Sequence, residues 1–359
     1  MTLQLYILRS LLHSFVFALT GISMVVLPTI LIQAVHKLGG VSMYSVFQYL
    51  PLVVVELVPY LLPMAFLLSV VSTFGRLAAD RELTAIRMAG IHPASLCVSS
   101  LILAAGLAFL THHLMSEVAP AYKYRARNFL RTAKTEAFKN MPPHQTHLSF
   151  GDMSMDWIGR DENGVLQGVS IRRGVEGGEL QTYTARTATI KIELNEAGQE
   201  VFVVDFEDCE LLHGNMWMKF ETPAFRSLLS ELFPADLKNQ NRAKYRSSSD
   251  LQKWLGQESY SRQEKDEFTF EINRRRALSI TCLIFVLLGI PTGIGLRSGT
   301  QLAAFTGAMG YGFVYYIGAL QLGKGLFHSG LVGAMPAAWV TAGLFSIAGL
   351  VLSYRILWR

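Results

Sequence analysis

The charged residues with the clearest spacing lie in GRLAADRELTAIRMAG, residues 75–90, between two long apolar runs. Because charge at the centre of a bilayer is costly, a segment of this composition between two membrane spans lies at or outside the membrane surface. Asp80 is the expected N-cap, and Glu82 falls in the first turn, where the helix dipole favours an anion. Arg87 falls in the last turn, and Gly90 suits the left-handed residue that ends a helix. The pattern predicts a short, partly apolar helix, which either merely links two spans or docks in the groove of a cytoplasmic ATPase.

A second candidate for chemistry is Glu56, an acidic residue in the middle of the second apolar run. An intramembrane carboxylate tends to face a cavity or a partner and is a functional candidate by default. A proton-coupled transporter would need such a group, although no His or Asp partner accompanies it in the run. Tyr311 and Tyr315, in the fifth run, are expected to pack against a neighbour or line a groove, and we group them with Glu56 as cavity candidates.

The elements that position these residues are membrane spans. Of the 359 residues, 51% are hydrophobic and only 16% are charged, whereas a soluble protein carries about a quarter charged residues. Six apolar runs reach the roughly 20 residues that a spanning helix needs. They cover about 11–35, 47–73, 96–118, 277–296, 302–323 and 332–354. The first run is too long for a signal peptide and has no small-residue cleavage site, so we interpret it as the first span.

The sequence shows no constellation of catalytic or metal-ligating residues. Cys97, Cys209 and Cys282 fall in different segments, with neither a metal-ligand spacing nor a disulfide framework. The chain also has no G-x-x-x-x-G-K-(S/T) phosphate loop, so it cannot hydrolyse ATP unaided. We therefore expect no enzyme activity and no metal or cofactor bound by this chain.

A polar insert of about 150 residues separates the third and fourth runs, and its middle is typical of β structure. TARTATIKIEL (184–194) and EVFVVDFEDCELL (200–212) alternate on either side of turn residues, and residues 153–173 resemble another strand pair. At least four or five strands are expected, enough for a sandwich, jelly roll or open barrel. Alternation makes four apolar side chains candidates for either a groove or a closed core. These are Ile190, Ile192, Phe202 and Val204.

Short loops fix the orientation, because long inserts translocate largely regardless of their charge. With both termini in the cytoplasm, most loop cations fall inside. These are Arg9, Arg76, Arg81, Arg87, Arg297, Arg355 and Arg359. The short outer loops keep only Lys37 and Lys324. This assignment places the β insert outside the inner membrane, in the periplasm.

Basic residues also gather where the insert meets the membrane. Such residues either anchor helices by snorkelling to the headgroups or attract a strongly anionic amphiphile. The candidates for such a phosphate-binding collar are Lys37, Arg274, Arg275, Arg276 and Lys324.

This arrangement resembles the permeases of the lipopolysaccharide export ABC transporter, the LptF/LptG (YjgP/YjgQ) family. GRLAADRELTAIRMAGI (75–91) is similar to the family's coupling-helix segment G-x-L-x-x-(D/E)-x-E-(L/I)-x-x-(L/M)-x-x-x-G. EINRRRALSITCLIFVLLGIPTGIGLRSG (271–299) resembles the family's entry into span four with its later G-(I/V)-P-x-G. PAAWV (336–340) resembles the start of its last span. The resemblance covers essentially the whole chain.

The resemblance implies a polytopic α-helical membrane protein with six transmembrane helices, three on each side of an inserted periplasmic β-jelly roll. Residues 1–118 would hold helices 1–3 with the coupling helix. Residues 119–272 would form the periplasmic domain, with the jelly roll at about 140–235 between helical flanks. Residues 273–359 would hold helices 4–6.

The resemblance also implies the function and the partners. The chain would be one permease of a heterodimer that extracts lipopolysaccharide from the inner membrane and passes it to a periplasmic bridge. An LptB-type ATPase dimer would use the ATP and Mg, and LptC-like and LptA-like proteins would receive the lipid; no nucleic acid is expected. The residues implied to engage the ATPase are Arg76, Asp80, Arg81, Glu82, Leu83, Ile86, Arg87 and Gly90.

Two other classes of function remain as alternatives. One is a proton-coupled secondary lipid transporter that uses Glu56 and needs no ATPase. The other is a non-transporting membrane scaffold with a periplasmic β domain, which usually needs fewer spans.

Overall fold

A computed structural model describes residues 2–38, 43–92, 94–139, 146–150, 153–161, 165–174, 180–194, 200–213, 216–220, 224–228, 243–295 and 301–357. The chain divides into two compact units. The first, here called the helical unit, comprises Met1–Gln33, Leu50–Ala126 and Arg242–Arg359. The second, here called the β unit, comprises Ala34–Tyr49 and Arg127–Asn241.

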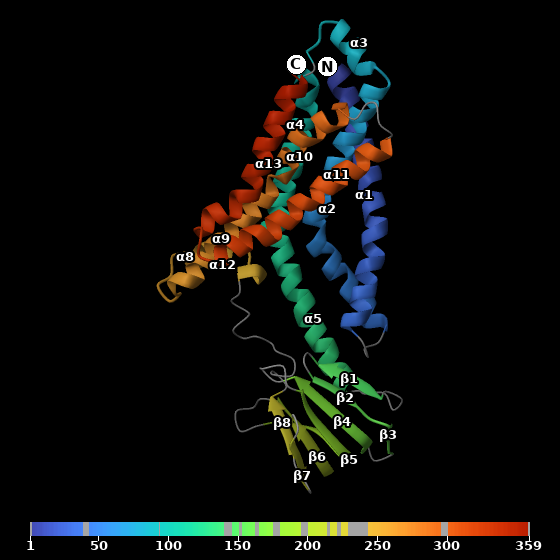
Figure 1. Ribbon diagram of the computed structural model, residues 1–359, viewed down its shortest axis with the longest axis vertical. Coiled ribbons are helices and arrows are strands. Elements are labelled where there is room, and N and C mark those ends of the chain that lie inside the picture. Colours follow the sequence, from blue (N-terminus) through green and yellow to red (C-terminus); the bar gives the residue numbers. More distant parts are fainter. Residues whose placement is uncertain are drawn as a thin grey trace. The chain divides into compact units, whose positions relative to one another are not determined.

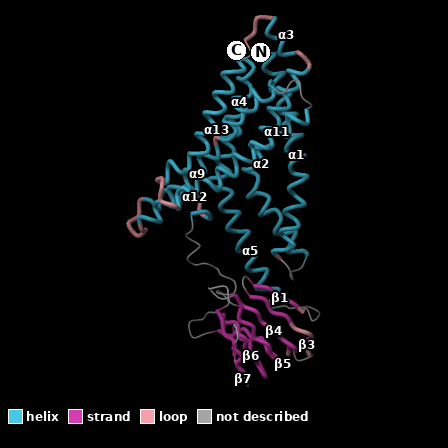
Figure 2. The backbone as a smooth tube through the Cα atoms, viewed as in Figure 1, coloured by secondary structure: helices cyan, strands magenta, loops and turns pink. Residues whose placement is uncertain are grey.

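Helices before the strands are α1 (Thr2–Lys37), α2 (Met43–Ala79), α3 (Glu82–Met88), α4 (Ala94–His113), the π-helix η1 (Leu114–Val118) and α5 (Ala119–Lys139) (Figure 1). Those after the strands are the 3-10 helix η2 (Ala243–Tyr245), α8 (Ser248–Leu255), α9 (Arg262–Ser279), α10 (Thr281–Gly295), α11 (Gln301–Ile317), the π-helix η3 (Gly318–Leu322), α12 (Gly323–His328) and α13 (Ala334–Leu357). Figure 2 shows that the strands gather in the β unit.

Five helices within the described residues are long and apolar enough to cross a membrane. They are Leu3–Lys37, Met43–Ala79, Ser95–Leu130, Arg262–Gly295 and Ala334–Ile356. The sixth predicted span, 302–323, falls on α11, whose 17 residues continue into η3 and α12 without a loop. Several helices are longer than the sequence suggested. The 37 residues of α2 extend about 55 Å at 1.5 Å per residue, well beyond the roughly 30 Å of a hydrocarbon core.

The spans differ sharply in how much of their surface the chain itself covers. In the apolar 18-residue stretch of Arg262–Gly295, 78% of the residues are buried by the rest of the chain, whereas in the corresponding stretch of Leu3–Lys37 only 17% are. Side chains of α10 such as Phe285, Val286 and Ile290 lie at the centre of two apolar clusters. The fourth span is therefore the core of the helical unit, and α1 is largely peripheral to it.

Eight described strands form one antiparallel sheet in the β unit. They are β1 (His147–Phe150), β2 (Met153–Asp156), β3 (Gly159–Arg160), β4 (Leu166–Gly174), β5 (Leu180–Leu194), β6 (Glu200–His213), β7 (Met216–Phe220) and β8 (Ala224–Leu228). The order is β1-β2-β4-β5-β6-β7, with β3 on β4 and β8 on β6. The predicted strand pair 184–194 and 200–212 is confirmed as β5 and β6, whereas the jelly roll stays a prediction.

In the neighbouring strands β4, β5 and β6, the alternation of inward and outward side chains is interrupted at one shared register position. Gly168 and Asp208 have positive φ values of 61° and 51°, and the strand register sets both level with Arg186 of β5. At this level each strand has two buried residues that are three positions apart, and strict alternation would place such residues on opposite faces of the sheet. The pairs are Leu166 and Val169, Ala185 and Ala188, and Phe206 and Cys209. Both halves of each strand thus contribute to a single core.

An exposed ion cluster on the sheet is centred on Asp156 of β2. His147 Nδ1 and Arg172 Nη2 lie 2.5 and 2.6 Å from its two carboxylate oxygens. These hydrogen bonds, first that of His147 and then that of Arg172, hold the pKa of Asp156 below its usual value. The cluster joins β1, β2 and β4 across the sheet.

Candidate functional site

The charged segment 75–90, between the second and third predicted spans, is divided between two helices. α2 continues through Ala79, and the N–H of Asp80 still donates to the carbonyl of Arg76 at 2.9 Å. Arg81 then turns the chain with a positive φ of 60° and occupies the N-cap position of α3. The prediction that Asp80 caps this helix is therefore wrong, because Asp80 belongs to the end of α2; no side-chain cap is found for α3 among the described residues.

The C-terminal end of α3 confirms the prediction from its glycine. Gly90 has φ +77°, its N–H donates to Arg87, and the N–H of Ile91 donates to Ile86. This pair of bonds is the Schellman arrangement, which satisfies the last carbonyls of a helix. Glu82 lies in the first turn and Arg87 in the last, as expected from the helix dipole.

One face of α3 is fixed to the ends of the first spans. Leu83 is buried in the apolar cluster that includes Ile7, Leu77 and Leu96 from α1, α2 and α4. The hydroxyl of Tyr6 donates to Glu82 at 3.1 Å. The opposite side is free of the helical unit, because Met88 is 85% exposed. Arg76, Asp80, Arg81, Arg87 and Gly90 are exposed as well, while Ile86 is half-buried. The anchored helix thus presents an exposed surface that includes Arg87 and Met88, at the end of the unit where both chain termini lie (Figure 1).

Close to α3, helices α2 and α10 approach each other through two glycines. A Cβ added to Gly293 would lie 2.8 Å from the carbonyl oxygen of Val71 and 3.0 Å from the amide nitrogen of Gly75. Only a residue without a side chain at position 293 permits this backbone contact. The fourth span is therefore held directly against the helix that leads into α3.

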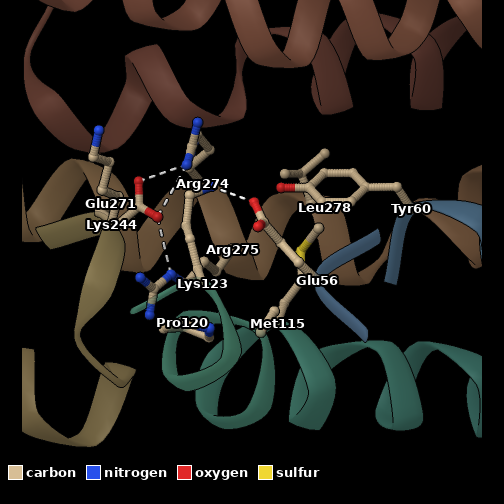
Figure 3. Close-up of a pocket in the computed structure, with 11 residues that line it drawn as sticks. Glu56, Tyr60, Met115, Pro120, Lys123, Lys244, Glu271, Arg274, Arg275 and Leu278 are labelled. Carbon is tan, nitrogen blue, oxygen red and sulfur yellow. Dashed lines mark hydrogen bonds and ion pairs between the residues drawn. The ribbon is translucent and has the colours of Figure 1, made fainter. Parts of the chain in front are cut away.

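At the other end of the fourth span, α9 carries a buried ionic cluster (Figure 3). Glu271 accepts from Arg274 at 2.8 Å and from Arg275 Nε at 3.0 Å. The Arg275 side chain is 5% exposed, and its guanidinium also donates to backbone carbonyls of Ala243 and Arg246 at 2.9 and 2.8 Å. Two cations share one carboxylate here, with the remaining donors of Arg275 satisfied by the chain.

Beside this cluster, Glu56 of α2 pairs with Lys123 of α5 at 2.7 Å. Both side chains line one open pocket together with Glu271, Arg274 and other residues (Figure 3). The lining residues are Glu56, Tyr60, Met115, Ala119, Pro120, Lys123, Lys244, Glu271, Arg274, Arg275 and Leu278. Among these described lining residues four cations outnumber two carboxylates, which gives this lining an excess of positive charge.

A family model described as the lipopolysaccharide export system permease LptF/LptG matches residues 5–355, nearly the whole chain. The chain belongs to the LptF/LptG family. A search among curated proteins found no match. Membership makes this chain a membrane permease of lipopolysaccharide export, a subunit that is not itself an enzyme and that works with other components of the export system.

The family motifs quoted from the sequence touch one another in this LptF/LptG chain. Gly75 of the first motif contacts Gly293 of the second. Asn273, also in the second, accepts a hydrogen bond from the indole of Trp339 in the third at 3.2 Å. The second motif, on α9 and α10, is therefore the hub that joins the other two.

The three cavity candidates, Glu56, Tyr311 and Tyr315, do not lie in one cavity. Tyr315 is fully buried, 2.9 Å from Thr281 Oγ1 and edge-on to Phe285. Tyr311 packs against the same apolar cluster. The described residues that line the Glu56 pocket include neither tyrosine. Glu56 therefore shares its pocket with the cations Lys123, Arg274 and Arg275 rather than with the two tyrosines, which pack in the core of the spans.

The five candidate collar residues differ in their exposure to solvent. Lys37, Arg276 and Lys324 are exposed, as a lipid-phosphate contact requires. Arg275 is buried and fully engaged by Glu271 and backbone carbonyls, so the expectation of an exposed collar side chain is wrong at this position. Arg274 is in between, since its side chain is 20% exposed and paired with Glu271.

The four apolar candidates of the β unit are register partners, since Ile190 lies opposite Val204 and Ile192 lies opposite Phe202. Val204 is fully buried in the core and Ile190 packs against that core. The side chains of Ile192 and Phe202 lie outside the described residues. A closed core thus accounts for Val204 without an open groove at that position.

Sequence reasoning missed Glu271 and the partner of Glu56. The signal for Glu271 was present, since Arg274 and Arg275 follow it at the i+3 and i+4 spacing of helical ion pairs. Lys123 lies 67 residues from Glu56, and no local pattern joins them.

Proposed function

We propose that this LptF/LptG chain is one of two permease subunits of an ABC transporter that extracts lipopolysaccharide from the inner membrane and passes it to a periplasmic bridge. A separate LptB-type ATPase dimer hydrolyses the ATP. The observation that carries the proposal is α3, a short helix with one face anchored through Leu83 and Glu82 and the other exposed at Met88. Such a helix can receive a push from a soluble partner and pass it to the spans.

The position of α3 supports the orientation that we propose. α3, the start of α1 and the end of α13 occupy the same end of the helical unit (Figure 1). With this end in the cytoplasm, the positive-inside rule is satisfied for the short loops. The β unit then belongs in the periplasm of an inner-membrane protein.

The lipid is expected to meet exposed cations and apolar surface. Lys37, Arg276 and Lys324 would hold the phosphates of lipid A, each contact contributing about 1 kcal/mol. Acyl chains would lie between the paired permeases. LptC-like and LptA-like partners would extend the sheet by strand addition at an exposed edge.

The proton-coupled alternative rests on Glu56 as an intramembrane carboxylate. Glu56 pairs with Lys123 at 2.7 Å, and this ion pair gives the carboxylate a structural role that needs no proton transfer. The scaffold alternative has no observation in its favour, since the family match covers both groups of spans.

Glu82→Lys tests the proposed coupling. The reversal opposes the helix dipole by about 0.3–1 kcal/mol, too little to unfold the chain. In a reconstituted transporter we expect it to lower lipid release per ATP hydrolysed and the amount of ATPase that co-purifies. Because Glu82 also accepts from Tyr6, Tyr6→Phe is the matched control that removes this bond alone. Normal export and ATPase recovery with Glu82→Lys would refute the coupling role of α3.

A further inference from the structure

The chain returns from the β unit to the spans through the segment Ala243–Leu255, and one arginine side chain, that of Arg275, makes three hydrogen bonds to this segment. Arg275 Nη2 donates to the carbonyl of Ala243 at 2.9 Å, and Nη1 donates to the carbonyl of Arg246 at 2.8 Å and to the Ser248 hydroxyl at 3.2 Å. All three acceptors lie within six residues of each other. The guanidinium therefore holds this turn in one conformation.

The same side chain reaches the third span. Nη1 of Arg275 lies 3.4 Å from the carbonyl of Ser116, inside the π-helix η1. A second link between these two segments is formed by Glu117, which accepts from the Ser249 hydroxyl at 3.1 Å. π-helical turns inside α-helices frequently occur at functional sites. The return segment is thus tied to the third and fourth spans at one point.

Apolar packing completes the attachment of the return segment. Leu251 is fully buried against Phe268 and Ile272 of α9, with Ala243 in the same cluster. Ser247 caps α8 by accepting from the N–H of Asp250, which fixes where the helix begins. α8 is therefore packed directly on α9, the first part of the fourth span.

The fourth span connects this junction to the neighbourhood of α3. Arg275 and Gly293 lie 18 residues apart along α9 and α10, a path of about 27 Å at 1.5 Å per residue. At its far end, Gly293 touches Gly75, four residues before α2 ends and seven before α3 begins. A displacement of α3 and α2 therefore has a continuous packed route to the return segment.

We infer that Arg275 is a positioning residue that locks the return segment Ala243–Leu255 to the third and fourth spans, so that movement of the fourth span is transmitted toward the β unit. The guanidinium is suited to this task because its fork of donors serves several acceptors at once, which a lysine ammonium on a flexible stem cannot do. Glu271 orients the fork by accepting from Nε. The inference rests on the proposed function for the identity of the cargo but not for the lock itself.

The lock is tested first by hydrogen–deuterium exchange on the full chain in nanodiscs. Arg275→Lys keeps the charge but loses most of the donors, and we expect amides of residues 243–255 to exchange on the order of tenfold faster, as the loss of a charged hydrogen bond implies. Arg276→Lys, at the exposed neighbouring position, is the matched control and should leave this exchange unchanged. Ser248→Ala removes one acceptor without touching the arginine and should give a smaller increase, which keeps the test valid if Arg275→Lys folds poorly. Unchanged exchange in both variants would overturn the inference.

A second measurement separates positioning from mere stability. With the ATPase present, we expect Arg275→Lys to keep ATP hydrolysis near the wild-type rate while lipid cross-linked to the β unit per ATP falls several-fold. A parallel fall in hydrolysis and cross-linking would mean that Arg275 only stabilises the fold, and would overturn the transmission role. If the wild type itself transfers no lipopolysaccharide, the proposed function fails, while the exchange result still decides whether the lock exists.

Discussion

Gly293→Ala is expected to destabilise the helical unit, because α10 lies against α2 with no room for a side chain there. The added Cβ would lie 2.8 Å from the Val71 carbonyl oxygen and 3.0 Å from the Gly75 amide nitrogen. Both are backbone atoms of a helix, so neither can rotate away. Lengthening the contact from 2.8 Å to the ordinary 3.4 Å requires the helices to separate by about 0.6 Å, which a close-packed interior resists.

Gly75→Ala is the matched control on the facing helix. Its Cβ would lie 3.6 Å from the Gly293 carbonyl oxygen, an ordinary contact. Each variant gains up to about 1 kcal/mol of helix propensity from the same exchange of glycine for alanine. Because this gain is common to both, the difference in their unfolding free energies isolates the overpacking cost, about 1–3 kcal/mol against Gly293→Ala.

The assay is thermal unfolding of the full chain in detergent, followed by far-ultraviolet circular dichroism. We expect a lower melting temperature for Gly293→Ala than for Gly75→Ala, and a lower yield of released lipid per ATP in the reconstituted transporter. Equal melting temperatures, or a lower value for Gly75→Ala, would refute the reasoning, since the asymmetry comes directly from the backbone geometry.

Three further predictions concern the β unit and the lipid. Gly168→Ala forces a side chain into a positive φ, which costs about 1–2 kcal/mol, so the buried Cys209 thiol should become labelled at lower denaturant than in wild type or in the control Gly159→Ala. Asp156 has a lowered pKa, so its ionised carboxylate stabilises the fold at pH values above the usual pKa of an aspartate, and this stabilisation is lost as the pH falls below about 4. Because the side chain is 36% exposed, the free energies of unfolding of wild type and Asp156→Asn should differ by no more than about 1 kcal/mol at neutral pH. The difference should vanish in acid, and labelling of Cys209 measures it. The last prediction concerns the exposed collar cations Lys37, Arg276 and Lys324. Their triple replacement by Gln should weaken photo-cross-linking of a phosphorylated lipid more than of its dephosphorylated form, and equal losses would mean that they only anchor helices.

Local patterns predicted where most of the described helices and strands lie. Apolar runs of spanning length and the alternation of 184–194 with 200–212 depend on neighbours in sequence, and the helices and strands follow them. The C-terminal end of α3 was predictable for the same reason, since Gly90 acts on the carbonyls of its own helix. Even the Glu271 ion pairs follow from helical spacing alone.

What the sequence left undecided depends on residues that meet only in the folded chain. Asp80 has the side chain of a good cap, but the length of α2, set by packing, places it at the end of another helix. Arg275 has the composition of a collar residue, but the return of the chain from the β unit supplies carbonyls that bury it. The contact of Gly75 with Gly293 joins positions more than 200 residues apart, so no window of sequence contains both. Sequence thus determined which helices, strands and charges exist, whereas the tertiary structure decided which charges face the lipid and which hold the protein together, because burial and pairing are set by the partners that folding brings near.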